Sequence, residues 1–561
     1  MATNTYDAIV VGSGITGGWA AKELTEKGLS VLVLEAGRTI TPEQDYVEHV
    51  PVWELKYRNW DSRDERRKKQ PVQREVYYAC DEYSSKFFVS DVENPYTNLG
   101  DTKFSWIRGR QVGGKSLTWG RQSYRWSDLD FEANLKEGHA IDWPIRYADI
   151  APWYEYVESH AGISGQPEGL PQLPDSKFLP PMEMNCAEMV FRDAISKHFD
   201  DRILTIGRTA ILTQTHKGRA ACHYCGVCHR GCITGSYFSS ISSTLPAAQK
   251  TGKLTMRPYS VVHSLNFDPK ARKVTSVRVI DAQTKATSEY KARIFFLCAS
   301  TLESTRIMLN SATSEFPHGL GNASGELGHN LMDHHMGAGA SGIIPGNEDK
   351  VPFGNRPNGI YLPRFRNVKT KQKDFVRGYG YQGGGSREGW GRGATTAGIG
   401  VDFKNALKAP GPWRMGLGGF GECLPYHTNY VEINKEKVDA WGVPTLNIHC
   451  AWGENEHKMS EDIAIQAAEM LAAAGARDIG VYQEISTPGL GIHEMGTARM
   501  GRDPKTSVLN EHNQVHDVKN VFMTDGACMT SAACVNPSLT YMALTARACD
   551  FAVKSIQKNE L

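Results

Sequence analysis

The sequence predicts an α/β fold with a parallel sheet and two lobes that are interleaved along the chain. At 561 residues, the chain is too long for one ordinary hydrophobic core. Residues 7–35 follow the order strand, glycine turn, helix and second strand, which is a βαβ unit and therefore indicates parallel strands. A hydrophobic content of 40%, with 55 glycines and 12 tryptophans, is typical of a folded chain with many loops and aromatic material for a pocket.

The charge balance argues against two classes of partner. Lys and Arg number 63 against 62 Asp and Glu, so no net field would gather nucleic acid or hold the chain on an anionic membrane. No run reaches the ~20 apolar residues that a membrane helix needs, and the apolar residues 292–299 are typical of a buried strand. The first residues lack a basic region followed by an apolar one, so we expect no export signal in the chain itself.

Three glycines at the first junction of strand and helix predict a dinucleotide site. Gly12, Gly14 and Gly17 form the pattern G-x-G-x-x-G. The first permits a tight turn, the second lets backbone amides approach a pyrophosphate, and the third lets helix and strand pack closely. Glu35 ends the second strand, where a carboxylate accepts hydrogen bonds from both ribose hydroxyls and repels a 2′-phosphate. The pattern therefore favours FAD or NAD over NADP.

Further segments resemble the glucose-methanol-choline (GMC) oxidoreductases and favour FAD. Residues 108–131, which include Gly113 and Gly114, are similar to a glycine loop that lies against the flavin in that family. The resemblance runs in order along the chain and weakens at 41–100 and 336–480. Its other blocks are residues 143–158, 295–311, 325–335, 493–504 and 521–548.

The resemblance implies a Rossmann-like FAD-binding domain interleaved with an α+β substrate domain, an architecture shared with p-hydroxybenzoate hydroxylase. We predict that the FAD-binding domain comprises residues 1–160, 215–335 and 486–561. The substrate-binding domain would comprise residues 161–214 and 336–485. The cysteine-rich loop discussed below falls in the FAD-binding part.

Two segments lie outside the similar blocks. Residues 41–103 are polar and are expected to form a surface excursion or a lid. Between residues 335 and 400 lies a stretch dense in glycine and aromatic side chains, including residues 377–393, and its glycine content is too high for a helix. We expect this second segment to form loops near the mouth of a pocket.

The carboxyl-terminal blocks contain the side chains that the resemblance assigns to catalysis. Oxidation of an alcohol by hydride transfer to a flavin needs a base for the hydroxyl proton, and imidazole suits this near neutral pH. His493 stands at the place of that base, and Asn536 at the place of a second side chain that holds the substrate oxygen. Because an amide does not take up the proton, His493 would be the only general base. The resemblance assigns no such role to His334 and His335, which are expected to be structural or to support the site from behind.

The same blocks imply contacts with the flavin. Asp525 and Gly526 end an apolar strand and match the family's contact with the ribityl chain and the pyrophosphate. The helix that opens at Pro537 would direct its positive end at the flavin C2 carbonyl, which stabilises the anionic reduced flavin. These roles follow from the resemblance.

Four cysteines within eleven residues predict a metal centre. Cys222, Cys225, Cys228 and Cys232 have the spacing C-x2-C-x2-C-x3-C. Four thiols in one compact loop are typical of ferredoxins, whereas structural zinc usually joins two separate C-x2-C pairs, so an iron–sulfur cluster is favoured over zinc. Ferredoxins usually have a proline directly after the fourth cysteine, and here Ile233 stands in its place. The cluster type therefore stays open: it would be a four-iron cluster (4Fe–4S), or a three-iron cluster (3Fe–4S) bound without Cys225, as in some relatives. Disulfides or plain structural thiols are the other alternative, and the eight scattered cysteines are expected to be buried thiols.

An iron–sulfur cluster indicates a dehydrogenase, because a path to a cytochrome needs a one-electron carrier whereas an oxidase reduces dioxygen at the flavin. The resemblance is closest to bacterial glucoside 3-dehydrogenases and to the flavoprotein subunits of gluconate and glucose dehydrogenases. Residues 10–38 favour the first, which would convert C3 of a glucoside to a 3-keto sugar. The alternatives are oxidation at C1 of glucose or C2 of gluconate, and a zinc-stabilised assembly protein that has kept a flavin fold without turnover.

The resemblance also implies partners besides the sugar or glycoside. Relatives of this type are often exported in the folded state by a small partner subunit with a twin-arginine signal, and they pass electrons to a c-type cytochrome. A chain without its own signal is therefore expected in the periplasm through such a subunit, or in the cytoplasm.

Overall fold

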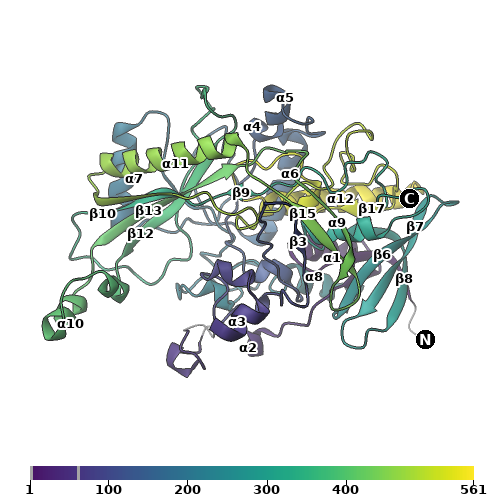
Figure 1. The fold of residues 1–561 in the computed structure, drawn as a ribbon, viewed down its shortest axis with the longest axis horizontal. Coiled ribbons are helices and arrows are strands. Elements are labelled where there is room, and N and C mark those ends of the chain that lie inside the picture. The colour runs from purple at the N-terminus through teal and green to yellow at the C-terminus, as the bar shows by residue number, and fades with distance from the viewer. Residues whose placement is uncertain (1–3, 48, 60–62) are drawn as a thin grey trace.

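The structure is a computed structural model that describes residues 4–47, 49–59 and 63–561. Within these residues, the strands form two sheets of seven strands each and a third sheet of three strands. The molecule is elongated, and each large sheet occupies one end of its long axis (Figure 1). The two sheets give the two lobes that the chain length predicts.

The first large sheet extends the predicted βαβ unit on both sides. β1 (Thr5–Val11), α1 (Ile15–Glu26) and β2 (Val31–Leu34) follow the predicted order, and the two strands pair in parallel. The sheet order is β5-β2-β1-β8-β7-β6, and β17 pairs with β8. The remaining strands come from later in the chain: β5 (Leu254–Arg257), β6 (Ser260–Asp268), β7 (Lys273–Asp281), β8 (Thr287–Leu297) and β17 (Val521–Met523).

Both faces of this mixed sheet are buried at the parallel strands β1 and β2, which explains the continuous apolar runs of these two strands. Ile9 and Val11 point into the main core, whereas Ala8 and Val10 point to the opposite face and pack with α1 and the carboxyl-terminal helix α12 (Ser538–Gln557). The alternation of successive side chains between two cores follows from the pleat of the strand.

The second large sheet is antiparallel, with the order β16-β10-β13-β12-β11-β4, and β9 pairs with β13. Helices α7 (Cys186–His198) and α11 (Glu454–Ala473) pack on it (Figure 1). Its strands are β4 (Thr205–Ile206), β9 (His334–His335), β10 (Ala338–Ile344), β11 (Ile360–Leu362), β12 (Tyr379–Arg387), β13 (Trp413–Glu422) and β16 (Arg477–Gln483).

The third sheet joins β14 (Tyr430–Val438) and β15 (Pro444–His449) to β3 (Thr97–Asn98). None of the helices in the described ranges is long and apolar enough to cross a membrane. The remaining α-helices are α2 (Pro42–Asp45), α3 (Arg63–Lys69), α4 (Asp128–Phe131), α5 (Ala133–Glu137), α6 (Tyr147–Ala161), α8 (Thr244–Lys250), α9 (Thr301–Asn310) and α10 (Gly400–Lys408).

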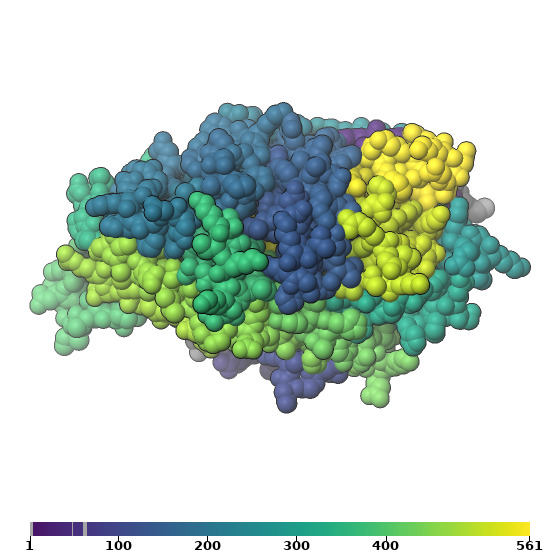
Figure 2. Space-filling view, turned by 90° about the horizontal axis from the view of Figure 1, so that it is seen from above, coloured from purple at the N-terminus to yellow at the C-terminus, as the bar shows by residue number. Residues whose placement is uncertain are grey.

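The lobes are interleaved, which confirms the predicted fold class. The first sheet takes its strands from residues 5–34, 254–297 and 521–523, and the second takes its strands from 205–206 and 334–483. Segments far apart in sequence therefore lie side by side, as Figure 2 shows for the yellow carboxyl-terminal surface beside a dark-blue segment from the first third of the chain. The domain boundaries given above stay a prediction.

The glycine-rich run 377–393 does not form loops, and this expectation was wrong. Most of it is β12, a strand inside the second sheet that pairs along its full length with the glycine-rich β13. The glycines allow the two backbones to approach closely: a Cβ on Gly383 would lie 1.9 Å from the carbonyl oxygen of Gly416. Glycine usually weakens a strand, and here it permits close packing between neighbouring strands.

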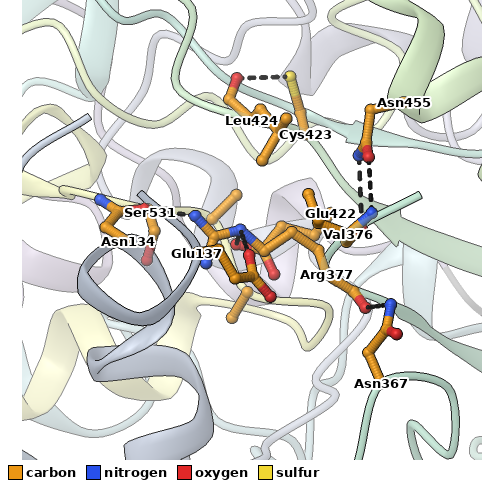
Figure 3. Close-up of polar contacts among 12 residues, drawn as sticks. Asn134, Glu137, Asn367, Val376, Arg377, Glu422, Cys423, Leu424, Asn455 and Ser531 are labelled. Atoms are coloured by element: carbon orange, nitrogen blue, oxygen red, sulfur yellow. Dashed lines mark hydrogen bonds and ion pairs between the residues drawn. The ribbon is translucent and has the colours of Figure 1, made fainter. Parts of the chain in front are cut away.

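A buried arginine connects the second sheet to α5. The Arg377 guanidinium, just before β12, lies 3.2 Å from Glu137 of α5 and 3.6 Å from Glu422 at the end of β13 (Figure 3). Arg377 also donates a hydrogen bond to Asn134. Both Arg377 and Glu422 are fully buried. Burial raises the pKa of Glu422 to about 7, although the nearby guanidinium groups favour its ionised form.

We predict that Glu422→Gln stabilises the protein at pH values above about 7 and has little effect near pH 4.5. A carboxyl group whose pKa is raised by folding contributes stability at pH values below its ordinary pKa of 4.5, and this contribution is lost as the pH rises towards 7. The loss is on the order of 3 kcal/mol, and an amide does not suffer it because it cannot ionise.

Thermal unfolding of the variant and of the wild type, at both pH values and one scan rate, measures this effect. The melting temperature of the variant should exceed that of the wild type by more at the higher pH. An equal difference at both pH values would mean that Glu422 does not titrate in this range.

Candidate active site

A large cavity of about 730 Å³ lies where the two lobes meet. Its lining combines Gly12, Gly14 and Glu35 of the first lobe with Gln382 of β12 and Phe420 of β13. The described part of the segment 41–103 also contributes to the wall, through Tyr78, Ala79, Phe88, Val89 and Asn94. This position agrees with the expectation of a lid.

The glycines of the first turn have two different tasks. Gly12 has a φ of +94°, and a Cβ on Gly17 would lie 2.0 Å from the Gly12 carbonyl oxygen, so both positions are closed to larger residues by the chain itself. A Cβ on Gly14 would meet nothing within 4 Å, and Gly14 lines the cavity. Because α1 begins directly after it, the unpaired N–H groups of the helix lie at the cavity, as an anion site requires.

Glu35 is held at the cavity by the backbone around it. One carboxylate oxygen accepts hydrogen bonds from the Ser13 hydroxyl (2.6 Å) and the Ser13 N–H (3.1 Å), and the other accepts from the Gly37 N–H (2.9 Å). Burial raises the pKa of Glu35, and these hydrogen bonds oppose the shift. Glu35 lines the cavity where a ribose would need an acceptor.

The second glycine loop packs directly on the first. The Gly113 N–H donates to the Ser13 hydroxyl at 3.0 Å, and a Cβ on Gly114 would lie 3.1 Å from the Cα of Gly14. Gly114 lines the cavity and Gly113 lies behind it. The two loops therefore form one continuous wall.

The carboxyl-terminal blocks form another wall. Asp525 and Gly526 line the cavity, and the Asp525 carboxyl accepts hydrogen bonds from the Ser304 hydroxyl (2.5 Å) and the Ala527 N–H (3.1 Å). Burial raises the pKa of Asp525 to about 6. α12 begins at Ser538 with Pro537 as its N-cap residue.

Two lining residues of α12 bring polar groups to this wall. Ser538 and Tyr541 line the cavity, so the positive end of the helix faces it, whereas Pro537 lies behind. The buried hydroxyl of Tyr541 has no hydrogen-bond partner among the described residues. A buried hydroxyl at a cavity wall needs a polar ligand.

His493 and Asn536 lie together in the cavity wall. The Nε2 atom of His493 is 3.4 Å from the Nδ2 atom of Asn536, and the backbone N–H of His493 donates to the carboxyl group of Asp333 at 2.9 Å. Burial, with smaller contributions from His334 and Lys115, holds the pKa of His493 well below its ordinary value of 6.5. This shift favours the neutral imidazole, which carries one ring nitrogen without a hydrogen.

Sequence reasoning missed two contacts of this pair. His334, which was expected to be structural or supporting, lies with its Nδ1 atom 2.8 Å from the Nδ1 atom of His493. Gln382 donates a hydrogen bond to the Asn536 side chain at 2.6 Å. The block that contains His334 resembles the family, so a signal existed for it, whereas Gln382 lies where that resemblance weakens and carried none.

The four clustered cysteines line one small hollow, with Ile211 and Tyr237 in its wall. Burial raises the pKa of Cys222 to about 11 and also raises that of Cys228. Cys228 lines the large cavity as well, so the two spaces share a wall. The lining thiols are those of Cys222, Cys225, Cys228 and Cys232.

The donor set suits an iron–sulfur cluster in kind, because thiolates are its usual ligands. As arranged, no group of three His, Cys, Asp or Glu side chains in the part of the chain described here could hold a metal ion. Of the eight scattered cysteines, seven are buried as expected. Cys186, at the start of α7, is partly exposed and departs from that expectation.

Comparison with protein families identifies the chain. One GMC oxidoreductase model matches residues 6–336, and a second GMC oxidoreductase model matches residues 425–545. The chain belongs to the GMC oxidoreductase family. It is therefore an FAD-dependent enzyme, and the alternative of an assembly protein without turnover is set aside.

Curated relatives match almost the whole chain. The 2-methyl-1,2-propanediol dehydrogenase of Mycolicibacterium austroafricanum is 29% identical over 97% of this chain and 94% of its own length. The fructose dehydrogenase large subunit of Gluconobacter japonicus is 25% identical over 99% of each chain. The gluconate 2-dehydrogenase flavoprotein of Pantoea cypripedii is 24% identical over 96% of this chain and 92% of its own. The GMC chain therefore has dehydrogenases of alcohols and sugars among its relatives.

Solved structures show the same fold. A pyridoxine 4-oxidase from Mesorbium loti matches 97% of this chain and 98% of its own with a TM-score of 0.59 and 17% identity. A variant of formate oxidase from Aspergillus oryzae matches 100% of both chains with a TM-score of 0.62 and 14% identity. At these identities the likeness concerns the fold, and it confirms the GMC architecture predicted from the sequence.

The large cavity fits the FAD of this family. The open space at Gly14 admits a pyrophosphate, the Glu35 carboxylate offers acceptors for a ribose, and the Tyr541 hydroxyl is available for a further hydrogen bond. Gly14 would contact the cofactor, whereas Gly17 would act through the packing of α1 on β1.

We predict that Gly14→Ala and Gly17→Ala separate these two tasks. The Gly14 variant should lose at least ~10-fold in FAD affinity while the apoprotein keeps its melting temperature, because its methyl group enters only the cavity. The Gly17 variant should have both a lower FAD affinity and a lower melting temperature, because its methyl group overlaps the Gly12 carbonyl and pushes helix and strand apart.

FAD released on denaturation, titration of the apoprotein with FAD, and apoprotein melting temperatures measure the two effects. Full FAD affinity in the Gly14 variant would show that the cofactor backbone does not approach this turn.

Proposed function

We propose that this GMC oxidoreductase is a dehydrogenase that oxidises a secondary hydroxyl of a sugar, at C3 of a glucoside, to a 3-keto sugar. The observation that carries the reaction type is the neutral imidazole of His493 beside the Asn536 amide in the cavity wall. Two relatives named as fructose dehydrogenase and gluconate 2-dehydrogenase support a sugar. The similarity of residues 10–38 to glucoside 3-dehydrogenases supports the C3 position.

In this proposal His493 is the general base. Its Nε2 atom takes the proton of the sugar hydroxyl, and the Nδ2 atom of Asn536 donates a hydrogen bond to the same oxygen. FAD bound in the cavity supplies the acceptor for the hydride that leaves the carbinol carbon. The lowered pKa of His493 keeps its imidazole neutral, so that a ring nitrogen is free to accept the proton.

α12 favours a negative charge on the cofactor side, because it presents its positive end through Ser538. The Lys115 ammonium group also lies at the wall, where it is paired with the carboxylate of Glu494 at 2.9 Å. A positive helix end is worth about 0.3–1 kcal/mol to a nearby negative charge, and more when it is partly buried. The chain thus supplies the base and the charge stabilisation from two separate elements.

We further propose that the electrons leave through an iron–sulfur cluster held by the loop from Cys222 to Cys232. The thiols of this loop would have to move closer together to bind it, because no three of them are placed to hold a metal ion in the described residues. The support is that Cys228 belongs to the walls of both the cofactor cavity and the cysteine hollow, so a cluster there would lie next to the flavin site. A bound cluster would supply a one-electron step between the flavin and an outside acceptor. The ligands would be Cys222, Cys228 and Cys232 for a three-iron cluster, with Cys225 added for a four-iron cluster.

Partners and location belong to the same proposal. One relative is named as a large subunit, which supports assembly with other subunits. We propose a small export subunit and a c-type cytochrome as partners and a periplasmic location. Co-purification of such a subunit from the native host tests this, and a chain that is isolated alone from the cytoplasm would contradict it.

Oxidation at C1 of glucose or C2 of gluconate is the second candidate, favoured by the gluconate 2-dehydrogenase relative. Anaerobic titration with a sugar panel, following flavin bleaching and identifying each product, separates the two. A 3-keto glycoside is neutral. A lactone from C1 oxidation of glucose hydrolyses to an acid, and the product of gluconate oxidation is also an acid.

We predict that His493→Ala retains FAD but lowers the rate of flavin reduction by sugar at least ~10²-fold, which is the usual effect of losing a positioned base. Stopped-flow absorbance under anaerobic conditions measures the rate, and the FAD content of each preparation is the control. An undiminished rate would assign the proton to another group.

We predict that Cys222→Ser separates the two half-reactions, because Cys222 lines the hollow and not the large cavity. Iron should be lost and cytochrome reduction should fall at least ~10-fold, while flavin reduction by sugar persists. A structural zinc site would instead lower both rates and the melting temperature together.

Iron and sulfide analysis, rapid mixing with sugar and steady-state cytochrome assays measure these effects. Cys225→Ser distinguishes the cluster types, since retained iron and turnover favour three ligands and loss of both favours four. Full cytochrome turnover in the Cys222 variant would remove the cluster from the electron path.

A further inference from the structure

We propose that His334 and Gln382 are positioning residues at the two ends of one hydrogen-bond chain that gives His493 and Asn536 their working orientations. The chain runs from His334 through His493 and Asn536 to Gln382. It keeps the hydrogen of His493 on Nδ1, so that the Nε2 lone pair and an N–H of Asn536 both face the cavity. The inference rests on the proposed role of His493 and deepens it.

Two backbone carbonyl groups set which atoms donate and which accept along the hydrogen-bond chain. The Nε2 atom of His334 lies 2.8 Å from the carbonyl oxygen of Ala533 and 3.2 Å from that of Ala532. A carbonyl oxygen only accepts, so this nitrogen must carry a hydrogen. Burial lowers the pKa of His334 to about 4, so the ring is neutral and its Nδ1 atom is left without a hydrogen.

The tautomer of His493 follows from that of His334. The two Nδ1 atoms lie 2.8 Å apart, and since the one on His334 is an acceptor, the one on His493 must donate. Burial keeps the pKa of His493 well below 6.5, so this ring is also neutral and holds a single hydrogen. Its Nε2 atom therefore carries the lone pair that a general base needs.

The tautomer of His493 in turn fixes which atoms of the two amide side chains donate and accept. Because the Nε2 atom of His493 is an acceptor, the atom of Asn536 that lies 3.4 Å from it must be the NH2 nitrogen. The Asn536 oxygen then points the other way and accepts from the Nε2 atom of Gln382 at 2.6 Å. The orientation of each amide thus follows from the backbone carbonyl groups at the His334 end of the hydrogen-bond chain.

These orientations match what a sugar hydroxyl needs. A hydroxyl placed between the two side chains would donate to the Nε2 atom of His493 while its oxygen accepts from Asn536. The other tautomer of His493 would present an N–H to that hydroxyl and could not take its proton. A histidine held in the wrong tautomer loses up to ~10⁴-fold in rate in another enzyme class, the serine proteases.

The side chains of the hydrogen-bond chain are carried by backbone segments that are themselves held by hydrogen bonds. His334 lies in β9, which pairs with the end of β13, and Gln382 lies within β12. The carboxyl group of Asp333 accepts hydrogen bonds from the N–H groups of Gly489, Gly491 and His493, which fixes the loop that carries the base. Such surrounding hydrogen bonds hold a catalytic side chain to its geometry.

His335 provides a matched control. It is buried beside His334 in the same short strand, and burial lowers its pKa to about 3, so it is neutral as well. Its Nε2 atom contacts the sulfur of Met459 at 3.3 Å. His335→Leu should therefore disturb the packing of β9 about as much as His334→Leu without changing the hydrogen bond to His493.

The decisive measurement is the tautomer of His493 in the FAD-bound protein, by nitrogen NMR of protein labelled with ¹⁵N-histidine, with signals assigned by their loss in His493→Gln. We expect the hydrogen on Nδ1 in the wild type and in His335→Leu. His334→Leu should shift the population towards Nε2–H, because the acceptor is gone. His334→Asn should retain the Nδ1–H form, because its amide oxygen can accept from it.

The rate of flavin reduction by sugar should follow the tautomer. We expect at least a ~10-fold loss for His334→Leu, recovery of most of that loss in His334→Asn, and less than a ~2-fold change for His335→Leu. FAD content and melting temperature establish that each variant is folded. Gln382→Leu should also lower the rate, and Gln382→Glu, which offers no N–H, should not restore it.

A wild-type His493 with its hydrogen on Nε2, or an unchanged tautomer in His334→Leu, would overturn the inference. Equal losses in His334→Leu and His334→Asn would do the same, because they would show that the acceptor is irrelevant. The NMR measurement needs no substrate. If no sugar reduces the flavin, the proposed function fails while the tautomer result still decides the positioning roles.

Discussion

The contact between Gly17 of α1 and the carbonyl of Gly12 after β1 is the constraint on which the cofactor site depends. Without side chains at these positions the helix can begin directly at the edge of the parallel sheet, so its free N–H groups lie at the cavity. The second glycine loop then packs on the first through Gly113 and Ser13. The wall of the cavity is thus assembled from close backbone contacts before any catalytic side chain is considered.

Burial is the second constraint, and it acts on proton occupancy. The pKa values of Asp333 and Glu422 are both raised to about 7 by burial, and that of His493 is lowered by it. Charged forms are costly in this part of the molecule, so neutral side chains and backbone groups carry most of the orientation. A chain of neutral donors and acceptors retains its direction because reversing it would leave a buried donor facing a donor.

The interleaving of the lobes explains how distant segments form one site. His493 comes from residues after β16, His334 from β9, and Asn536 from the segment before α12. The cysteine loop enters the same wall through Cys228 and also contacts the segment 41–103, where His229 lies 3.2 Å from the Asp81 carboxylate.

The sequence by itself determined the βαβ unit, the glycine fingerprint with Glu35, and membership of the GMC family, because these signals lie within short continuous stretches. Through the resemblance of their blocks it also singled out His493 and Asn536, whose catalytic roles stay a prediction. Their geometry could not be read in this way.

Only the tertiary structure decided how His334 and Gln382 meet His493 and Asn536, that residues 379–387 form a strand, and that Cys228 borders both spaces. Each of these depends on contacts between residues far apart in the chain. The close packing of β12 depends on the glycines of β13, and in our proposal the tautomer of His493 depends on His334. Local sequence patterns contain neither partner, and folding brings them together.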